Sequence, residues 1–180
     1  MSLWTRTGSS AKAMRSHSCR PCREAEMTAR LCLEPFAPAE ELDRLIGRGD
    51  AGAVASFTGI ARARSSDGSA VTGLFLDHHE RLTKRSLDAI AAAARARFAV
   101  DDVLILHRCG AILPGEPIVL AAAAARHRRA ALEAVDYMMD RLKSEAVFWK
   151  REDRADGAEW IEPTEEDRIA LARWSQSCPE

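Results

Sequence analysis

The sequence predicts a single α+β domain in which strands and helices share one hydrophobic core. Apolar runs of strand length alternate along the chain with segments whose apolar residues recur at helical spacing. A length of 180 residues is enough for one domain with a substantial core and short for two. The 47% hydrophobic and 29% charged content is typical of a globular protein, and no apolar stretch reaches the ~20 residues that span a bilayer.

The first predicted elements are a short strand at 29–33 and a short helix at 38–46. A proline opens the helical segment and Gly47 follows it, which are the places where these two residues are favoured. Two further strands are predicted at 51–62 and 71–79. A Ser-Ser-Asp-Gly turn separates them, so we expect the two strands to pair as a hairpin.

The central part of the chain is predicted to form a helix followed by two strands. Thr83 is suited to cap the helix, and one buried stripe along it is formed by Leu87, Ile90, Ala91, Ala94 and Phe98. The apolar run at 103–106 is typical of a strand covered on both faces. The segment 118–125 is ambiguous, because its five consecutive alanines favour a helix. We assign it to a strand on its length and on the Leu-Pro-Gly-Glu turn before it.

The C-terminal third is predicted to begin with a long helix at 128–146. Its period directs one set of residues toward the core, namely Leu132, Val135, Met139 and Leu142, and another toward solvent, namely Arg129, Glu133, Asp136, Asp140 and Lys143. A strand at 147–152 and an extended Trp160-Ile161 pair follow. Thr164, with Asp167 three residues later, has the pattern of a capping box and begins a final helix that reaches Trp174.

The two ends of the chain lack a hydrophobic period. Residues 1–26 are expected to be a disordered N-terminal extension, residues 27–175 the domain, and residues 176–180 a flexible tail. Cys19 and Cys22 form a C-x-x-C without a second pair at zinc-site spacing, so we expect no bound metal. The odd total of five cysteines is consistent with a reducing, cytoplasmic setting.

The lysines of this chain are concentrated in one place. Only four of the 26 basic residues are lysines, and two of them, Lys143 and Lys150, flank an apolar Val-Phe-Trp run. Burial can lower the pKa of a lysine until it acts as a nucleophile or an acid and base, whereas arginine stays charged. The alternative is a pair of solvated surface lysines, with Lys143 in an ion pair with Asp140 one helical turn earlier.

A second basic group, residues 126–129 (Arg-His-Arg-Arg), stands where a strand passes into a helix. Unpaired N–H groups and a partial positive charge favour phosphate at a helix N-terminus, although the cluster could equally face only water. Arg62 ends a strand beside a turn, a common place for binding groups. His107 is expected to be a hydrogen-bonded core residue. No nucleotide-binding or serine-nucleophile motif is present, which indicates lysine and arginine chemistry on an anionic substrate, without a cofactor.

Several blocks, in this order and spacing, resemble the catalytic (large) subunits of molybdopterin synthase, the MoaE family: FTGIAR at 57–62, HRCG at 107–110, LPGE at 113–116, HR at 127–128, and, after Lys143, FWKRE at 148–152. The resemblance covers residues 28–174. It implies an α/β hammerhead-like fold with a mixed or antiparallel sheet and flanking helices. It also implies a homodimer that binds a small ubiquitin-like sulfur carrier at each end, giving a heterotetramer.

The resemblance further implies a reaction and a set of site residues. The expected sulfurtransferase moves two sulfurs from a thiocarboxylate on the carrier's C-terminal Gly-Gly to cyclic pyranopterin monophosphate, forming the dithiolene of molybdopterin. Lys143 and Lys150 are expected to be catalytic, and the expected substrate-binding residues are Arg62, His127, Arg128, Lys143, Lys150, Arg151 and Glu152. The chain departs from the family pattern at Asp77, His79 and Arg126.

Two other functions are compatible with parts of the sequence. One is a non-catalytic module that binds anions or RNA through the arginine clusters. The net charge of −1 and the lack of interleaved aromatic residues weigh against this reading, as against any nucleic-acid or membrane partner. The other is a paralogue that binds the carrier without turnover, which the presence of both lysines disfavours. Co-purification of a small protein ending in Gly-Gly would separate these possibilities.

Overall fold

The computed structural model describes residues 28–49, 51–65, 67–162 and 164–174, so the predictions made for both chain ends lie outside the described residues. The described chain forms two four-stranded sheets and four helices. In spatial order, the first sheet contains β1 (Ala29–Cys32), β4 (Asp102–Arg108), β6 (Pro117–Ala125) and β2 (Ala53–Ile60). The second contains β5 (Gly110–Ile112), β3 (Val71–His78), β7 (Phe148–Arg154) and β8 (Gly157–Ile161). The predicted α+β class is confirmed.

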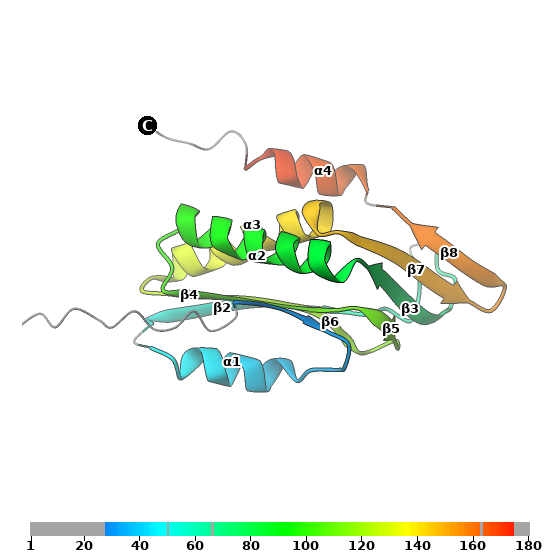
Figure 1. The fold of residues 1–180 in the computed structure, drawn as a ribbon, viewed down its shortest axis with the longest axis horizontal. Coiled ribbons are helices and arrows are strands. Elements are labelled where there is room, and N and C mark those ends of the chain that lie inside the picture. The colour runs from blue at the N-terminus through cyan, green and yellow to red at the C-terminus, as the bar shows by residue number, and fades with distance from the viewer. Residues whose placement is uncertain (1–27, 50, 66, 163, 175–180) are drawn as a thin grey trace, which may run out of the picture.

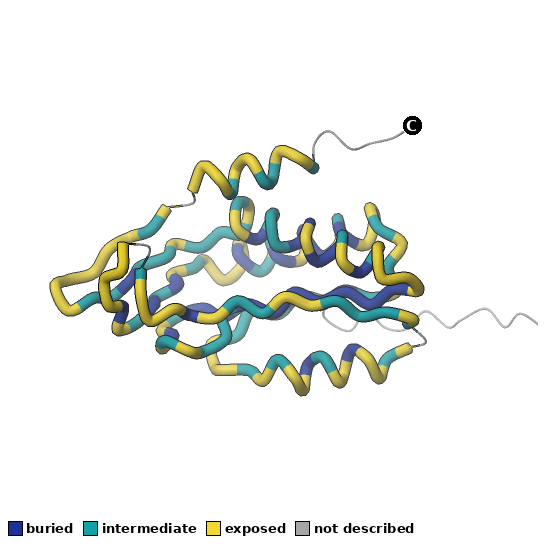
Figure 2. Tube along the Cα trace, turned by 180° about the vertical axis from the view of Figure 1, so that it is seen from behind, coloured by how far each residue is buried: buried dark blue, intermediate teal, exposed yellow. Residues whose placement is uncertain are grey.

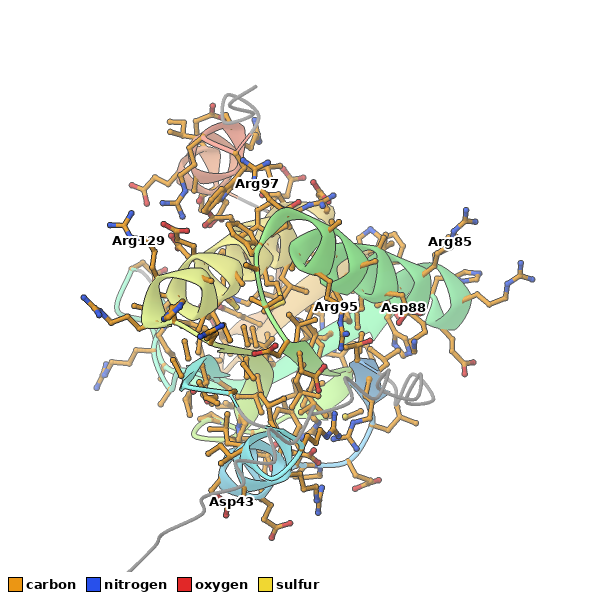
Figure 3. The ribbon with its side chains drawn as sticks, turned by 90° about the vertical axis from the view of Figure 1, so that its left-hand side faces the viewer. Asp43, Arg85, Asp88, Arg95, Arg97 and Arg129 are labelled. Carbon is orange, nitrogen blue, oxygen red and sulfur yellow. The ribbon has the colours of Figure 1, made fainter. Side chains whose placement is uncertain are left out.

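Helices cover both faces of the first sheet. Helix α1 (Pro38–Ile46) lies on one face, and α2 (Glu80–Arg97) and α3 (Arg128–Glu145) lie on the other, as Figure 1 and the end-on view of Figure 3 show. Helix α4 (Glu165–Ala172) packs on the outer side of α3. The second sheet projects beyond the helices. Many residues of α4 and of the β7–β8 hairpin are exposed, as Figure 2 shows. None of the described helices is long and apolar enough to cross a membrane.

The alanine run of β6 explains how a central strand is covered on both sides. Ala121 and Ala123 belong to the core beneath α2 and α3, whereas Ala122 and Ala124 belong to the core above α1. Side chains alternate between faces along a strand, so small residues let helices approach the sheet closely from both sides. The assignment of this segment to a strand is therefore confirmed, although alanine favours a helix.

The predicted hairpin between the second and third strands is wrong. β2 pairs with β6, and β3 pairs with β5 and β7, so the two strands lie in different sheets. Among the described residues, a short bridge between Arg64 and Ala70 joins the segments that lead out of β2 and into β3. The backbone N–H of Ala61 donates to the carbonyl of Glu116 at 2.9 Å, so this part of the chain is already paired with the segment that enters β6.

Two predictions, one about the cap of α2 and one about the buried face of α3, are also corrected. His79, not Thr83, caps α2, and its Nδ1 accepts from the Leu82 N–H at 3.4 Å. Thr83 is fully buried one turn further on, and its hydroxyl donates to the Val147 carbonyl at 2.6 Å. On α3, Val135 and Leu142 are buried as predicted, but Leu132 is 59% exposed, and its predicted inward place is taken by Ala131.

Phe148 connects the cores of the two sheets. It packs against the core formed by α2, α3 and the first sheet, and also against the smaller core of Ala61, Leu74, Leu76 and Ile112. Val147 is fixed at the same point by Thr83. The start of β7 is therefore held firmly, and β7 carries Lys150, one of the two residues predicted to be catalytic.

Candidate functional site

The predicted site residues lie at two separate ends of α3. His127 is the N-cap of α3, Arg128 is its first residue and Lys143 is in its last turn. Lys143 lies fifteen positions after Arg128, and this spacing corresponds to about 22 Å along the helix axis. Figure 1 shows β7 continuing beyond the C-terminal end of α3, which places Lys150 still further from His127. The basic cluster and the lysine pair are therefore not neighbours within one chain.

At the lysine end, Lys150 belongs to a row of charges on β7. Lys150, Glu152 and Arg154 alternate along the strand and so share one face. The Nζ of Lys150 lies 2.9 Å from Oε1 of Glu152, and Nη2 of Arg154 lies 3.3 Å from its Oε2. Glu152 is buried, so this single carboxylate separates two cations on the inner face of the second sheet.

The pKa of Glu152 reflects these neighbours. Burial alone raises it, but the hydrogen bond and charge of Lys150 and the hydrogen bond of Arg154 together bring the pKa below its ordinary value. Glu152 is therefore ionised at neutral pH. Its ionised carboxylate lies within ion-pair distance of Lys150.

Lys143 has a different partner from the one predicted. Its Nζ lies 2.9 Å from Oδ1 of Asp167 at the start of α4, whereas Asp140 accepts from Arg173 and from the indole N–H of Trp174. The alternative of a Lys143–Asp140 pair is wrong, because α4 supplies a carboxylate that the helix period alone could not reveal. The capping box of α4 is confirmed, and Asp167 is part of it.

Arg151 points to the opposite face of β7. Its Nε lies 2.9 Å from Oδ1 of Asp153, and its guanidinium lies over the rings of Phe75 and Trp160 at 4.9 and 5.7 Å from their centroids. This outer face also contains an open hollow of about 350 Å³ lined by Asp77, Trp149 and Trp160. Arg151 is thus separated from Lys150 by the strand itself.

Arg62 lies toward the lysine end of the molecule. It is exposed and follows Ala61, which belongs to the same small core as Leu76, the strand partner of Lys150. β2 is eight residues long, or about 26 Å. Because His127 stands next to the opposite end of β2, Arg62 is remote from the basic cluster as well.

His107 is confirmed as a hydrogen-bonded residue, although it is only half-buried. Its Nδ1 lies 2.8 Å from the Arg108 carbonyl oxygen, and its ring stacks on Phe148 with centroids 4.1 Å apart. Burial lowers the pKa of His107 to about 4, so its ring is neutral at physiological pH. This neutral ring supports the start of β7.

The basic end of α3 is open to solvent. His127 and Arg128 are exposed, the first turn contains no acidic residue, and no side chain caps the helix. Figure 3 shows Arg129 directed away from the core. Gly52 fixes the approach to this end, because a Cβ at that position would lie 2.5 Å from the Arg126 carbonyl oxygen. Free N–H groups with nearby cations form a competent anion site.

Sequence reasoning missed two residues of the lysine end. The capping-box pattern identified Asp167 only as a helix cap, and Arg154 was one arginine among many, without a motif to distinguish it. Among the described residues, no group of three histidine, cysteine, aspartate or glutamate side chains could hold a metal ion. The arrangement offers two ion-paired ammonium groups at one end of α3 and an anion site at the other.

Comparison with known proteins identifies the relatives of this sequence. The profile of one family, described as MoaE protein, matches residues 31–145. A molybdopterin synthase catalytic subunit from Caulobacter vibrioides is 46% identical over 151 residues, which is 83% of this chain and 99% of the relative.

Solved structures agree in fold. The molybdopterin biosynthesis MoaE protein from Burkholderia ambifaria superimposes with a TM-score of 0.70 at 38% identity, covering 83% of this chain and 99% of that protein. A complex of subunits 1 and 2 of the molybdopterin-converting factor from Helicobacter pylori contains a chain with a TM-score of 0.62 at 22% identity, covering 77% of this chain and 91% of that one. This last likeness concerns the fold alone.

Proposed function

This chain belongs to the MoaE protein family, and we propose that two of its lysines, each ion-paired with a carboxylate, carry out the sulfur transfer of molybdopterin synthesis. Like its catalytic-subunit relatives, it is an enzyme of molybdenum cofactor biosynthesis. The proposed reaction takes two sulfurs from a carrier's C-terminal thiocarboxylate and adds them to cyclic pyranopterin monophosphate. The observation that carries this proposal is the pairing of Lys143 and Lys150, each with its own carboxylate.

The ion pairs indicate how the lysines take part. Lys150 forms an ion pair with Glu152, and Lys143 forms one with Asp167, so each lysine is held beside a carboxylate. A cation can hold an anionic thiocarboxylate and stabilise negative charge that develops when it attacks the pterin side chain. An ammonium group can also deliver a proton when the cyclic phosphate opens. Both roles suit an anionic donor and an anionic acceptor.

His127 and Arg128 are proposed to bind the substrate phosphate. A helix N-terminus presents backbone N–H groups and a partial positive charge, and these two side chains add hydrogen-bond donors to it. Both side chains are exposed, so a ligand can reach them. Arg62, at the lysine end, is proposed to contact the same substrate from its other side.

The distance along α3 implies that a complete site needs two copies of the chain. About 22 Å of helix separates Arg128 from Lys143, and side chains project sideways from a helix rather than along it. One pyranopterin therefore does not contact both groups within a single chain. We propose an isologous homodimer in which Lys143 and Lys150 of one copy face His127 and Arg128 of the other. By symmetry, such a dimer contains two sites.

The proposed sulfur donor is a small ubiquitin-like carrier protein that ends in Gly-Gly. Support comes from the Helicobacter pylori relative in fold, which was solved as a complex of two subunits. An extended glycine tail is narrow enough to enter a site between two subunits. With one carrier at each site, the assembly is a heterotetramer.

Single-turnover sulfur transfer tests the lysine assignment. The chain is mixed with a thiocarboxylated carrier and cyclic pyranopterin monophosphate, and dithiolene formation is followed in the wild type and in Lys143→Ala and Lys150→Ala. Each substitution is expected to lower the rate by a factor of about 10² or more, the range for loss of a proton-transfer or charge-stabilising group. Lys84→Ala, which removes a carboxylate-paired lysine of α2 outside the proposed site, is the control. Conversion at the wild-type rate by both lysine variants would contradict the proposal.

A further inference from the structure

We propose that the C-terminal helix α4 is part of the catalytic centre, because its residue Asp167 positions the ammonium group of Lys143. The inference rests on the proposed function of Lys143 and adds a residue to it. The Nζ of Lys143 lies 2.9 Å from Oδ1 of Asp167, although the two residues are 24 positions apart in the sequence. Asp167 is a positioning residue, since it acts on the substrate only through Lys143.

The two oxygens of the Asp167 carboxylate have different tasks. Oδ2 accepts hydrogen bonds from the hydroxyl of Thr164 at 2.8 Å and from the Thr164 N–H at 3.1 Å, which completes the capping box. Oδ1 accepts from Lys143. The Asp167 side chain is 17% exposed and that of Lys143 is 59% exposed. A carboxylate fixed by its own helix thus orients a lysine that would otherwise move freely in solvent.

Contacts between α4 and α3 hold Asp167 beside Lys143. α4 contributes no buried residue of its own, so it adds little to the core. Near Lys143, the Ser144 hydroxyl donates to the Asp167 carbonyl oxygen at 3.3 Å. Past the other end of α4, the indole N–H of Trp174 donates to Asp140 at 2.7 Å, and its ring packs edge-on against Tyr137. These contacts keep the start of α4 beside the last turn of α3 (Figure 1).

Asp167 leaves the ammonium group able to bind substrate. A lysine has three N–H donors, and the described contacts of Lys143 use one of them. The other two remain available for a thiocarboxylate or phosphate oxygen. The neighbouring acids on α3 are engaged elsewhere, because Asp140 and Asp136 pair with Arg173 and Glu145 pairs with Arg141. Asp167 is therefore the carboxylate that stabilises the charge of Lys143 among the described residues.

Three variants separate this role from simple support of the helix. Asp167→Asn keeps an oxygen that can cap α4 but removes the negative charge beside Lys143. Asp167→Glu keeps the charge. Thr164→Ala weakens the capping box and leaves the Asp167 carboxylate in place. Each variant is assayed for single-turnover sulfur transfer with a saturating thiocarboxylated carrier, and its melting temperature is measured in parallel.

We expect Asp167→Asn to lower the rate about tenfold, the value of one lost charge-assisted hydrogen bond. Asp167→Glu should restore most of the rate, because it keeps the carboxylate beside Lys143, and Thr164→Ala should keep the wild-type rate even if its melting temperature falls. A wild-type rate for Asp167→Asn would overturn the inference, as would equal losses in Asp167→Asn and Thr164→Ala. Full activity of Lys143→Ala would instead contradict the proposed function of Lys143.

Discussion

At the scale of single residues, the buried carboxylate of Glu152 is the most consequential group of the site. It is held between Lys150 and Arg154, and its pKa lies below its ordinary value. A carboxyl group with a lowered pKa in the folded state stabilises the protein at pH values above its unfolded pKa. That contribution is lost as the pH falls through the folded pKa.

Glu152→Gln should therefore destabilise the protein in a pH-dependent way. Near neutral pH, the free energy of unfolding should fall by about 1–3 kcal/mol, because two cations lose their charged partner in a buried place. As the pH falls below about 4.5, the difference from the wild type should shrink, because the wild-type carboxyl also becomes neutral. Urea denaturation at several pH values measures this difference. A constant difference over the whole range would show that charge is not the cause.

The chemistry of the site residues could be predicted from the sequence better than their partners. The concentration of lysine around a Val-Phe-Trp run indicated Lys143 and Lys150, and a strand-to-helix junction indicated His127 and Arg128. Their ion-pair partners could not be predicted equally well. Asp140 is near Lys143 in sequence, but the contact with Asp167 depends on how α4 returns across α3. Such a contact is long-range, and helical periodicity contains no information about it.

At the scale of secondary-structure elements, Arg154 joins three segments at the edge of the site. Besides Glu152 on its own strand, its guanidinium contacts Ser65 and Asp67 in the turn before β3 and Glu159 on β8. Its side chain is only 13% exposed. A well-buried arginine with partners on several elements restrains all of them at once, unlike an exposed ion pair.

Arg154→Ala should consequently lower the free energy of unfolding by more than the loss of an exposed ion pair does, because the buried carboxylate of Glu152 loses one of its cations. Arg168→Ala is the matched control, since Arg168 is exposed and, among the described residues, its ion-pair partner is Glu165 one turn earlier on α4. That control should change stability by less than about 0.5 kcal/mol. Denaturation midpoints compare the two variants directly, and equal effects would argue against the linking role of Arg154.

The elements themselves were largely predictable, whereas the strand pairing was not. Period and turn residues located α1 and β6 correctly, even though β6 contains five alanines. The same reasoning failed for the supposed hairpin, because a turn between two strands shows where the chain bends and not which strand becomes the neighbour. Ala61 is already paired beside β6, and β3 crosses into the other sheet.

At the scale of the whole molecule, the two ends of α3 carry different parts of the proposed site. One end carries Lys143 and leads into β7, and the other presents His127 and Arg128 to solvent. About 22 Å of helix lies between Arg128 and Lys143. An active site that uses both ends must be completed by a second copy of the chain, and a two-fold symmetric dimer provides two such sites.

Activity of a mixed dimer tests this claim most directly. Lys143→Ala and Arg128→Ala chains with different affinity tags are co-expressed, and dimers that contain one of each are isolated. Each parental variant should be nearly inactive at low substrate concentration. If sites form between subunits, one site of the mixed dimer has all its wild-type residues, so it should recover about half of the wild-type rate per dimer. A mixed dimer no more active than its parents would show that each site is built within one chain and would contradict the account.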